Sequence, residues 1–401
     1  MVEGQDRIKR VFLDIINWYM NIAFVHDVFP MGGAERVTID IARYLSHHEQ
    51  GFRIFVYCKQ INESLVGDAV RDILTVRLVP KGHLASSCIE RLVVEDGIQV
   101  LVQVVHRIPG IERIKQNTGV KVVMSNHGEP FWQRYLFMKR KQRRHPILWK
   151  AGLSFIYGKC GYAMRKAVKI TMLNLCSCDA YTVLCEDYKS TICGKLGLNP
   201  DSSHIVVIGN AEHPVDDVCM SKDKVIMYCG RLYNSTKRVD RLLRIWGRVQ
   251  NRLPDWRLIL VGDGPDREDL ENQILKDRLE RVTITGWVSD VSQYYRQASI
   301  LCLTSQTESW GLSLTEAQAN GVIPVVFDCS AGVRSIIEPS GVNGFLVPSF
   351  DEEEYASTLL RVAKMSDDEQ YVLRTNVVKK CSEYSLERVG KKWRELFDSL
   401  C

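Results

Sequence analysis

The chain of 401 residues is long enough for two or three domains, and 45% hydrophobic and 25% charged residues are ordinary values for a soluble globular protein. No run of about twenty uncharged apolar residues occurs, which argues against a transmembrane helix. The formal net charge is +5, mildly basic, but the positive residues are concentrated in one part of the sequence.

Most of the thirteen cysteines lie inside apolar runs, such as Cys229 in VIMYCG and Cys302 in ILCLT. Cysteine in such a run behaves as a small hydrophobic residue. The sequence has no C-x-x-C pair and no Cys/His cluster with zinc spacing. Because the cysteine count is odd and no secretory signal is seen, we expect a reducing, cytoplasmic location.

The first residues, MVEGQDRIKRVFLDIINWY, do not fit the pattern of strands and helices that begins at Met20. Residues 1–19 are therefore an N-terminal extension, an amphipathic arm or a misassigned start. The sequence does not distinguish between these.

The first domain, expected at 20–209, opens with a buried strand at 21–26. The loop DVFPMGGAERV then leads into a helix that continues through Leu45. Gly32 and Gly33 in this loop allow a ligand to approach the backbone closely, or allow φ values closed to other residues. A plain turn is the alternative.

Further apolar runs alternate with helical or loop segments, which is the mark of a parallel α/β sheet. These strands are predicted at 52–58, 74–79, 99–105, 121–124, 180–185 and 204–208. The strand at 121–124 is followed by SNHGEP, so His127 lies just beyond a strand end, where a residue faces the ligand site of an open sheet. His127 is thus either a structural histidine or part of a site.

A basic and aromatic segment follows, FWQRYLFMKRKQRRHPILWKAGLSFIYGKCGYAMRKAVK. Its cations cluster at Lys139, Arg140, Lys141, Arg143 and Arg144. Cations beside aromatic rings at helical spacing suit an anionic membrane surface. Nucleic-acid binding and a solvated helix with core aromatics are the alternatives, and we expect no nucleic acid partner.

The segment 210–223, with Pro214 and several acidic residues, is predicted to be the interdomain linker. The second domain, expected at 224–384, opens with a buried strand that ends at Cys229. Arg231 and Lys237 follow this strand end. Two cations there can neutralise a diphosphate as it leaves, although surface charges are the alternative.

A strand in WRLILVGDGPDREDL is followed by the loop Gly262, Asp263 and Gly264. This G-x-G is a weak signal, and without the full G-x-G-x-x-G fingerprint it argues against a dinucleotide enzyme. The next strand is predicted in RVTITGWV.

The most informative stretch is ILCLTSQTESWGLSLTEAQANGVIPVVF, at 300–327. It predicts a strand at 300–303, a helix from about Gly311 to Gly321 and a strand at 323–327. Glu308 lies in the turn and Glu316 in the helix. Helix N-terminal amides suit a diphosphate, and the two carboxylates suit sugar and ribose hydroxyls. The alternative is two solvated surface charges.

The remaining sequence predicts a short helix at 332–337, a strand in NGFLVP and a helix at 351–364. The stretch YSLERVGKKWRELFDSL, at 384–400, is amphipathic, and the segment 385–401 is expected to be a last helix.

Glu308 and Glu316 stand in an E-x7-E pattern, and ESWGLSLTEAQANGVIPV resembles the donor-site segment of glycosyltransferase family 4. GGAERV, IGN at 208–210 and GR…K at Arg231 and Lys237 are also similar to that family. The resemblance implies an α/β protein of the GT-B fold, two Rossmann-like domains facing across a cleft. It covers most of 20–400 and is thin between 130 and 169.

The resemblance also implies roles for individual residues. Glu308 would act on the transferred sugar, and His127 would contact the sugar or the acceptor. The expected donor-binding residues are Gly32, Gly33, Arg231, Lys237, Val288, Ser309, Trp310, Gly311, Leu312 and Glu316. Trp310 departs from the family, where Phe is more usual, but it keeps the bulk. The last helix would cross back to the first domain.

The predicted function is a retaining glycosyltransferase that moves a sugar from a nucleotide-diphosphate sugar, such as a UDP-sugar, to a glycan or lipid-linked acceptor. The sequence does not choose between same-face attack and double displacement. It lacks any D-x-D, so we expect no metal or other cofactor. A catalytically silent nucleotide-sugar-binding scaffold and a nucleotide-sugar isomerase are the alternatives. We expect a cytoplasmic protein, with the basic segment as the candidate contact to the membrane.

Overall fold

The computed structural model describes residues 19–30, 32–48, 51–82, 84–158 and 161–401. The prediction for 1–19 therefore lies, except for Tyr19, outside the described residues. The chain divides into two compact units. One holds the residues up to Gly209 together with Val389–Cys401, and the other holds Asn210–Arg388.

The first unit is built on a parallel sheet with the strand order β3-β2-β1-β4-β5-β6-β7. Its strands are β1 (Met20–Phe29), β2 (Phe52–Ile61), β3 (Thr75–Leu78), β4 (Val100–Val104), β5 (Lys121–Ser125), β6 (Ala180–Val183) and β7 (Ile205–Val207). All were predicted, but β1 and β2 are longer than expected because their pairing continues to Phe29 opposite Ile61.

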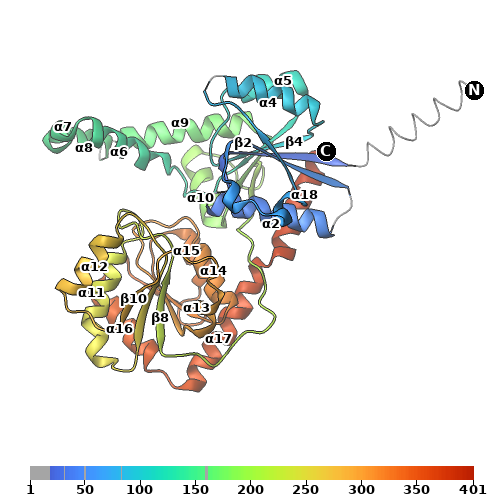
Figure 1. Ribbon diagram of the computed structural model, residues 1–401. Helices are drawn as coiled ribbons and strands as arrows, with labels where there is room; N and C mark the ends of the chain where they lie inside the picture. Colours follow the sequence, from blue (N-terminus) through green and yellow to red (C-terminus); the bar gives the residue numbers. More distant parts are fainter. Residues whose placement is uncertain (1–18, 31, 49–50, 83, 159–160) are drawn as a thin grey trace, which may run out of the picture. The chain divides into compact units, whose positions relative to one another are not determined.

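Helices cover both faces of this sheet, as expected for strands that are apolar throughout. Figure 1 shows α4 and α5 on one face and α2 and α18 on the other. The helices of this unit include α2 (Gly33–His48), α4 (Leu84–Glu95), α5 (Ile111–Thr118), α9 (Tyr162–Ser177) and α10 (Glu186–Leu196). Of α18 (Leu386–Leu400), the part from Val389 onward groups with this unit, where Phe397 packs against Phe24 with ring centroids 6.5 Å apart.

The second unit has a parallel sheet of order β10-β9-β8-β11-β12-β13, the Rossmann arrangement. Its strands are β8 (Val225–Cys229), β9 (Arg257–Val261), β10 (Val282–Ile284), β11 (Ile300–Leu303), β12 (Ile323–Phe327) and β13 (Phe345–Val347). The strand order reverses between β8 and β11. Ligands of such sheets bind beyond the carboxyl ends of the strands at this reversal.

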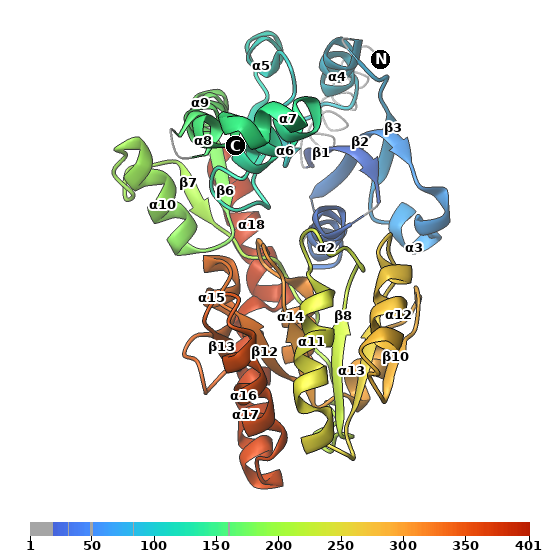
Figure 2. The same ribbon diagram turned by 90° about the vertical axis from the view of Figure 1, so that its left-hand side faces the viewer.

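Helices α11 and α16 lie together on one face of the second sheet, and α14 and α17 on the other (Figures 1 and 2). The helices of this unit are α11 (Val239–Val249), α12 (Arg267–Lys276), α13 (Ser292–Gln297), α14 (Leu312–Ala319), α15 (Ala331–Ile337), α16 (Glu352–Ala363) and α17 (Asp367–Cys381). Helix α17 was not predicted from the sequence.

The segment expected to be a linker belongs to the second unit and is bonded to it at both ends. Near its start, Glu212 forms a parallel bridge with Ser385, and its buried carboxylate accepts a bond from Thr315 on α14 (2.9 Å). Near its end, Lys222 Nζ donates to the carbonyl oxygens of Tyr295 and Asn320 (2.9 and 2.8 Å). These bonds fix the segment against α13 and α14.

No helix in the described part of the chain combines the length and the apolar character needed to cross a bilayer. No disulfide joins the cysteines that the structure describes. Burial raises the pKa of the Cys302 thiol to about 12, which agrees with its predicted role as a small hydrophobic residue.

Candidate active site at the sheet reversal of the second unit

Two loops meet where the strand order of the second sheet reverses. The loop after β8 carries Arg231 and Lys237, and the loop after β11 carries Glu308. Lys237 Nζ lies 2.5 Å from Glu308 Oε2, and both side chains are largely buried, 29% and 14% exposed. The structure therefore brings one predicted cation and one predicted carboxylate into direct contact, although they are far apart in the sequence.

Three further hydrogen bonds join the same two loops. The Gln306 amide donates to the carbonyl oxygen of Thr236 (2.7 Å), and the Thr304 hydroxyl donates to that of Arg238 (2.9 Å). The Gln306 side chain accepts a bond from the guanidinium of the buried residue Arg241 (2.7 Å). Since these residues flank Lys237 and Glu308, the bonds set the register of the pair.

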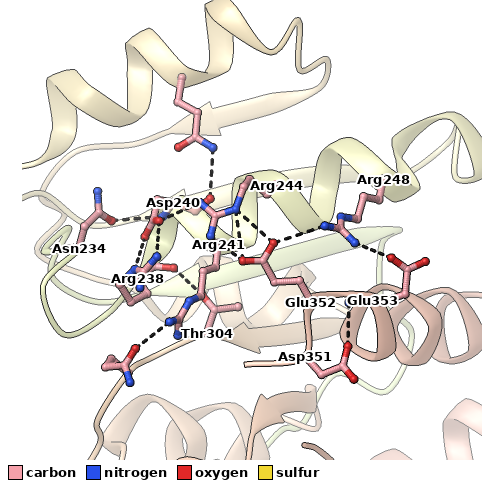
Figure 3. Close-up of polar contacts among 12 residues, drawn as sticks. Asn234, Arg238, Asp240, Arg241, Arg244, Arg248, Thr304, Asp351, Glu352 and Glu353 are labelled. Carbon is pink, nitrogen blue, oxygen red and sulfur yellow. Dashed lines mark hydrogen bonds and ion pairs between the residues drawn. The ribbon is translucent and has the colours of Figure 1, made fainter. Parts of the chain in front are cut away.

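A network of ion pairs anchors the loop to α11 and α16, as Figure 3 shows. Arg238, at the start of α11, has the left-handed φ of 49° that is unfavourable for a side chain, and both its guanidinium bonds go to Asp240 (2.8 Å each). Arg244 bridges Asp240 and Glu352, 2.9 and 2.5 Å away. These contacts hold the backbone next to Lys237 in one conformation.

Arg231 is exposed, and its guanidinium lies 5.7 Å from the centre of the Tyr233 ring. Among the residues that the structure describes, no carboxylate pairs with it. The buried Tyr228 holds this loop, because its hydroxyl donates to the Arg231 carbonyl (2.9 Å). Arg231 thus differs from Lys237 in presenting a charge that no described acid neutralises.

The glycines of the weak G-x-G motif have a structural role. The Leu232 amide donates to the carbonyl of Asp263 (2.9 Å), so the two loops run backbone to backbone. A Cβ at Gly262 would lie 2.0 Å from the Gly230 oxygen, and one at Gly264 would lie 2.2 Å from the Leu232 oxygen. The motif therefore shapes the Arg231 loop.

Replacing Gly264 with alanine is expected to lower the free energy of unfolding by about 1–3 kcal/mol, the usual cost of overpacking. The new methyl group would collide with backbone rather than with a flexible side chain. Thermal unfolding followed by circular dichroism measures the effect. Gly194→Ala is the control, because Gly194 lies in helix α10 with nothing within 4 Å of an added Cβ, and alanine is the better helix former. An unchanged melting temperature for Gly264→Ala would contradict this.

Glu316 lies in the middle of α14, and its Oε2 accepts a hydrogen bond from the Tyr295 hydroxyl (2.6 Å). Tyr295 is fully buried, and burial, the Glu316 charge and the Cys229 thiol raise its pKa well above the usual value. The neutral phenol therefore remains a donor that orients the carboxylate. The sequence analysis missed Tyr295, because a tyrosine in the short helix SQYYRQ carries no signal of this role.

Gly311 lies at the N-cap of α14 with φ of 93°, a value that favours glycine. The Trp310 indole is buried against Tyr384 (ring centroids 5.0 Å apart), so this residue can meet a ligand only through its backbone. The other predicted donor residues, Ser309, Leu312 and Val288, are half-buried in loops or at the first turn of the helix.

Gly32 and Gly33 lie in the first unit, at the start of α2. The Gly32 amide already donates to Glu35 Oε2 (2.8 Å). The other oxygen of Glu35 is 3.4 Å from His26 Nδ1. Burial opposes the charge of Glu35, yet the bonds from His26, the Glu35 amide and the Gly32 amide keep its pKa below the usual range. Gly32 was expected to allow a ligand close to its backbone, and in this structure its N–H donates to Glu35.

His127 also lies in the first unit, just beyond β5. Its Nε2 is 3.1 Å from the Ser125 hydroxyl, and the side chain is half-buried. Next to it, an added Cβ at Gly128 would lie 2.4 Å from the Trp132 ring. This glycine is therefore needed for the close packing of Trp132, and the strand-end position of His127 agrees with the prediction.

Residues 223–365, most of the second unit, match the family model of glycosyl transferases group 1. Together with two parallel Rossmann-like sheets, this match supports a glycosyltransferase with the GT-B fold. The site at the sheet reversal lies within the matched residues.

The similarity to individual proteins points the same way. An uncharacterized glycosyltransferase of Haemophilus influenzae is 26% identical over 92% of this chain and 98% of its own length. The lipopolysaccharide 1,6-galactosyltransferase of Salmonella typhimurium is 31% identical, but over only 41% of this chain and 44% of its own length. Among solved structures, Anabaena HepE in complex with UDP and glucose aligns with a TM-score of 0.73 over 95% of this chain and 100% of that chain, at 18% identity. This likeness shows the fold.

Proposed function

We propose that this protein is a retaining glycosyltransferase that transfers a sugar from a nucleotide-diphosphate sugar to a saccharide or lipid-linked acceptor. The observation that carries the proposal is the Lys237–Glu308 contact at the reversal of the second sheet. A glycosyltransferase breaks the bond between a sugar and a diphosphate, and a cation and a carboxylate at this place can each stabilise the charge that develops on one of the two. The departing diphosphate gains negative charge, and the sugar gains positive charge.

Arg231 and Lys237 bind the diphosphate in this proposal, with the backbone amides near Gly311 and Leu312. The first free amides of a helix favour an anion, and α14 begins here. Glu316 accepts hydrogen bonds from the ribose hydroxyls, oriented by the Tyr295 phenol. Tyr295 orients Glu316 and the sheet reversal positions the two loops before the donor arrives, which favours electrostatic stabilisation, whereas Lys237 changes its partner when the donor binds.

Glu308 orients the sugar and stabilises the charge that develops at the anomeric carbon. Its contact with Lys237 has to loosen when the donor binds, since the lysine then turns toward the phosphates. Because both side chains retain some exposure, this exchange needs no burial of an unpaired charge. As the bond between the anomeric carbon and the diphosphate breaks, the acceptor oxygen bonds to that carbon on the same face, and the departing phosphate accepts the proton of the acceptor hydroxyl.

The donor is proposed to be a UDP-sugar, and the acceptor a saccharide of surface polysaccharide or glycolipid assembly. HepE, which has the same fold, was solved with UDP and glucose. The Salmonella relative is a lipopolysaccharide galactosyltransferase. Gly32 and Gly33 are proposed to contact the donor phosphates, and His127 the sugar or the acceptor.

The proposed reaction needs no metal ion, because Arg231 and Lys237 supply the positive charge that a divalent cation would otherwise supply. Excess EDTA is therefore expected to leave the initial rate of UDP release unchanged within error, in an assay where magnesium-free enzyme and donor are used. Loss of activity with EDTA, restored by added magnesium or manganese, would contradict this part of the proposal.

The experiment that tests the function offers the purified chain a panel of UDP-, GDP- and ADP-sugars with and without a membrane extract as acceptor. We expect transfer from one UDP-sugar and an anomeric configuration that is retained, as measured by NMR of the product. Conversion of the donor to another sugar without an acceptor would indicate an isomerase. Nucleotide-sugar binding without any turnover would indicate a binding scaffold.

A further inference from the structure

The basic segment forms an arm of helices that projects from the first unit. It consists of α6 (Gln133–Arg144), α7 (Pro146–Leu148), a π-helical turn (Trp149–Leu153) and α8 (Ser154–Tyr157), which pack on one another and on α9. Helix α9 in turn packs on β5 and β6. Figure 1 shows α6, α7 and α8 beyond the end of α9, away from the sheet, and Figure 2 looks onto them.

The structure sorts the aromatic residues of this segment into two groups. Tyr157 is buried inside the arm, between Trp149 and Tyr162, with ring centroids 6.3 and 4.9 Å away. Lys166 lies over the Phe137 and Tyr162 rings. These contacts hold the helices together, whereas Tyr135 and Phe155 form a second group that stays exposed (40% and 55%).

Large apolar side chains, most of them aliphatic, form the outward surface at the tip of the arm. Ile147 is 80% exposed, the highest value for a large apolar side chain in the described part of the chain. Leu148 and Ile156 are 57% and 49% exposed, and Phe155 is 55% exposed. Several neighbouring apolar side chains that are exposed to water normally mark a site where a protein or a membrane binds.

The charge around this tip has a single sign. No aspartate or glutamate occurs between Glu129 and Asp179. The exposed cations of the stretch include Lys139, Arg140, Arg143, Arg144 and Lys150. A positive rim around an apolar tip is complementary to a surface that is negative outside and apolar beneath.

We propose that the tip of this arm, Ile147, Leu148 and Ile156, inserts into the headgroup layer of an anionic lipid bilayer while the arginines of α6 bind lipid phosphates. The arm would hold the first unit at the membrane without a spanning helix. This lipid contact goes beyond the proposed sugar transfer and stands on separate residues, so either can fail without the other.

The exposed side chains favour lipid over the other partners. Nucleic-acid surfaces stack bases on exposed aromatic rings, whereas the two most exposed apolar groups here are the aliphatic Ile147 and Leu148, with Phe155 beside them in exposure, and the Tyr157 ring is buried. A protein partner would need carboxylates placed to meet this basic rim. A bilayer with anionic headgroups satisfies both the apolar tip and the uniform charge.

The test is sedimentation of the full chain with vesicles of phosphatidylcholine alone, and of two parts phosphatidylcholine to one part phosphatidylglycerol. We expect binding to the anionic vesicles only. Each cation near the surface adds about fivefold to binding, so Arg140→Gln, Arg143→Gln and Arg144→Gln together are expected to weaken it about a hundredfold. Ile147→Ser, Leu148→Ser and Ile156→Ser together are expected to weaken it about tenfold or more.

The control is Leu275→Ser, which removes an equally exposed apolar side chain (77%) from α12 of the second unit and is expected to change nothing. All replaced side chains are exposed, and circular dichroism is used to check that the variants fold.

Equal binding by the serine variant and the wild type would overturn the insertion of the tip. If the wild type does not bind vesicles but forms a dimer, and the serine variant is a monomer, the tip would be assigned to contact with a second copy of the chain. Retention of the wild type by RNA but not by vesicles would assign the arm to nucleic acid.

Discussion

Replacing Glu308 with glutamine is expected to lower kcat by about a hundredfold to a thousandfold, the usual cost of removing one group that stabilises transition-state charge. The amide keeps the shape of the side chain but cannot balance the positive charge at the anomeric carbon. Because donor binding relies mainly on the diphosphate, KM for the donor is expected to change far less than kcat. Initial rates of UDP release at varied donor concentrations measure both quantities.

The same substitution is expected to lower the free energy of unfolding by only about 1–2 kcal/mol, since the glutamine oxygen can still accept a hydrogen bond from Lys237 although the ion pair is lost. The matched control is Glu271→Gln, which breaks an ion pair of the second unit with Arg267 (2.8 Å) on the exposed side of α12. That variant is expected to keep the full rate. Full activity of Glu308→Gln, in a protein that melts normally, would remove Glu308 from the chemistry.

Replacing Arg231 with alanine is expected to weaken UDP binding by about tenfold to a hundredfold, the loss of one charge-assisted hydrogen bond. Arg231 is the cleaner test of the diphosphate site, because no described carboxylate pairs with it, whereas replacing Lys237 also releases Glu308. The affinity of UDP for wild type and variant is measured by isothermal titration calorimetry.

The ligand series supplies the internal control for this variant. Uridine lacks phosphates, so its affinity is expected to be the same for Arg231→Ala and the wild type. A variant that loses affinity for uridine and UDP alike would have a damaged base site or fold instead. The exposed Arg252 offers a matched substitution, and Arg252→Ala is expected to bind UDP normally.

The strands were predictable because each one is marked by a run of apolar residues in its own sequence. ILCL at 300–303 and IPVVF at 323–327 are buried on both faces, and a parallel strand with two covered faces reads as an unbroken apolar run. The turn and helix between them follow from Gly311 and Gly321, both of which have positive φ. The positions of Lys237 and Glu308 at strand ends then predict that they face one site.

Features that depend on distant contacts were not predictable. Helix α17 was missed because its buried face includes Arg374, which donates to the carbonyl oxygens of Ser299 and Gly321 rather than packing as an apolar residue. Its capping box, Ser366 with Glu369, was the signal available in the sequence. The Tyr295 contact with Glu316 joins residues 21 apart in the sequence and arises only when the chain folds, whereas the bond from the Gly32 amide to Glu35 is local, and a glutamate three residues after Gly32 was the signal for it.

The most direct test of the central claim is a structure of the chain with a bound UDP-sugar. The account predicts the diphosphate within hydrogen-bond distance of Arg231 and Lys237, the ribose hydroxyls on Glu316, and the sugar beside Glu308. A donor bound elsewhere on the second unit, with the Lys237–Glu308 pair intact and untouched, would contradict it.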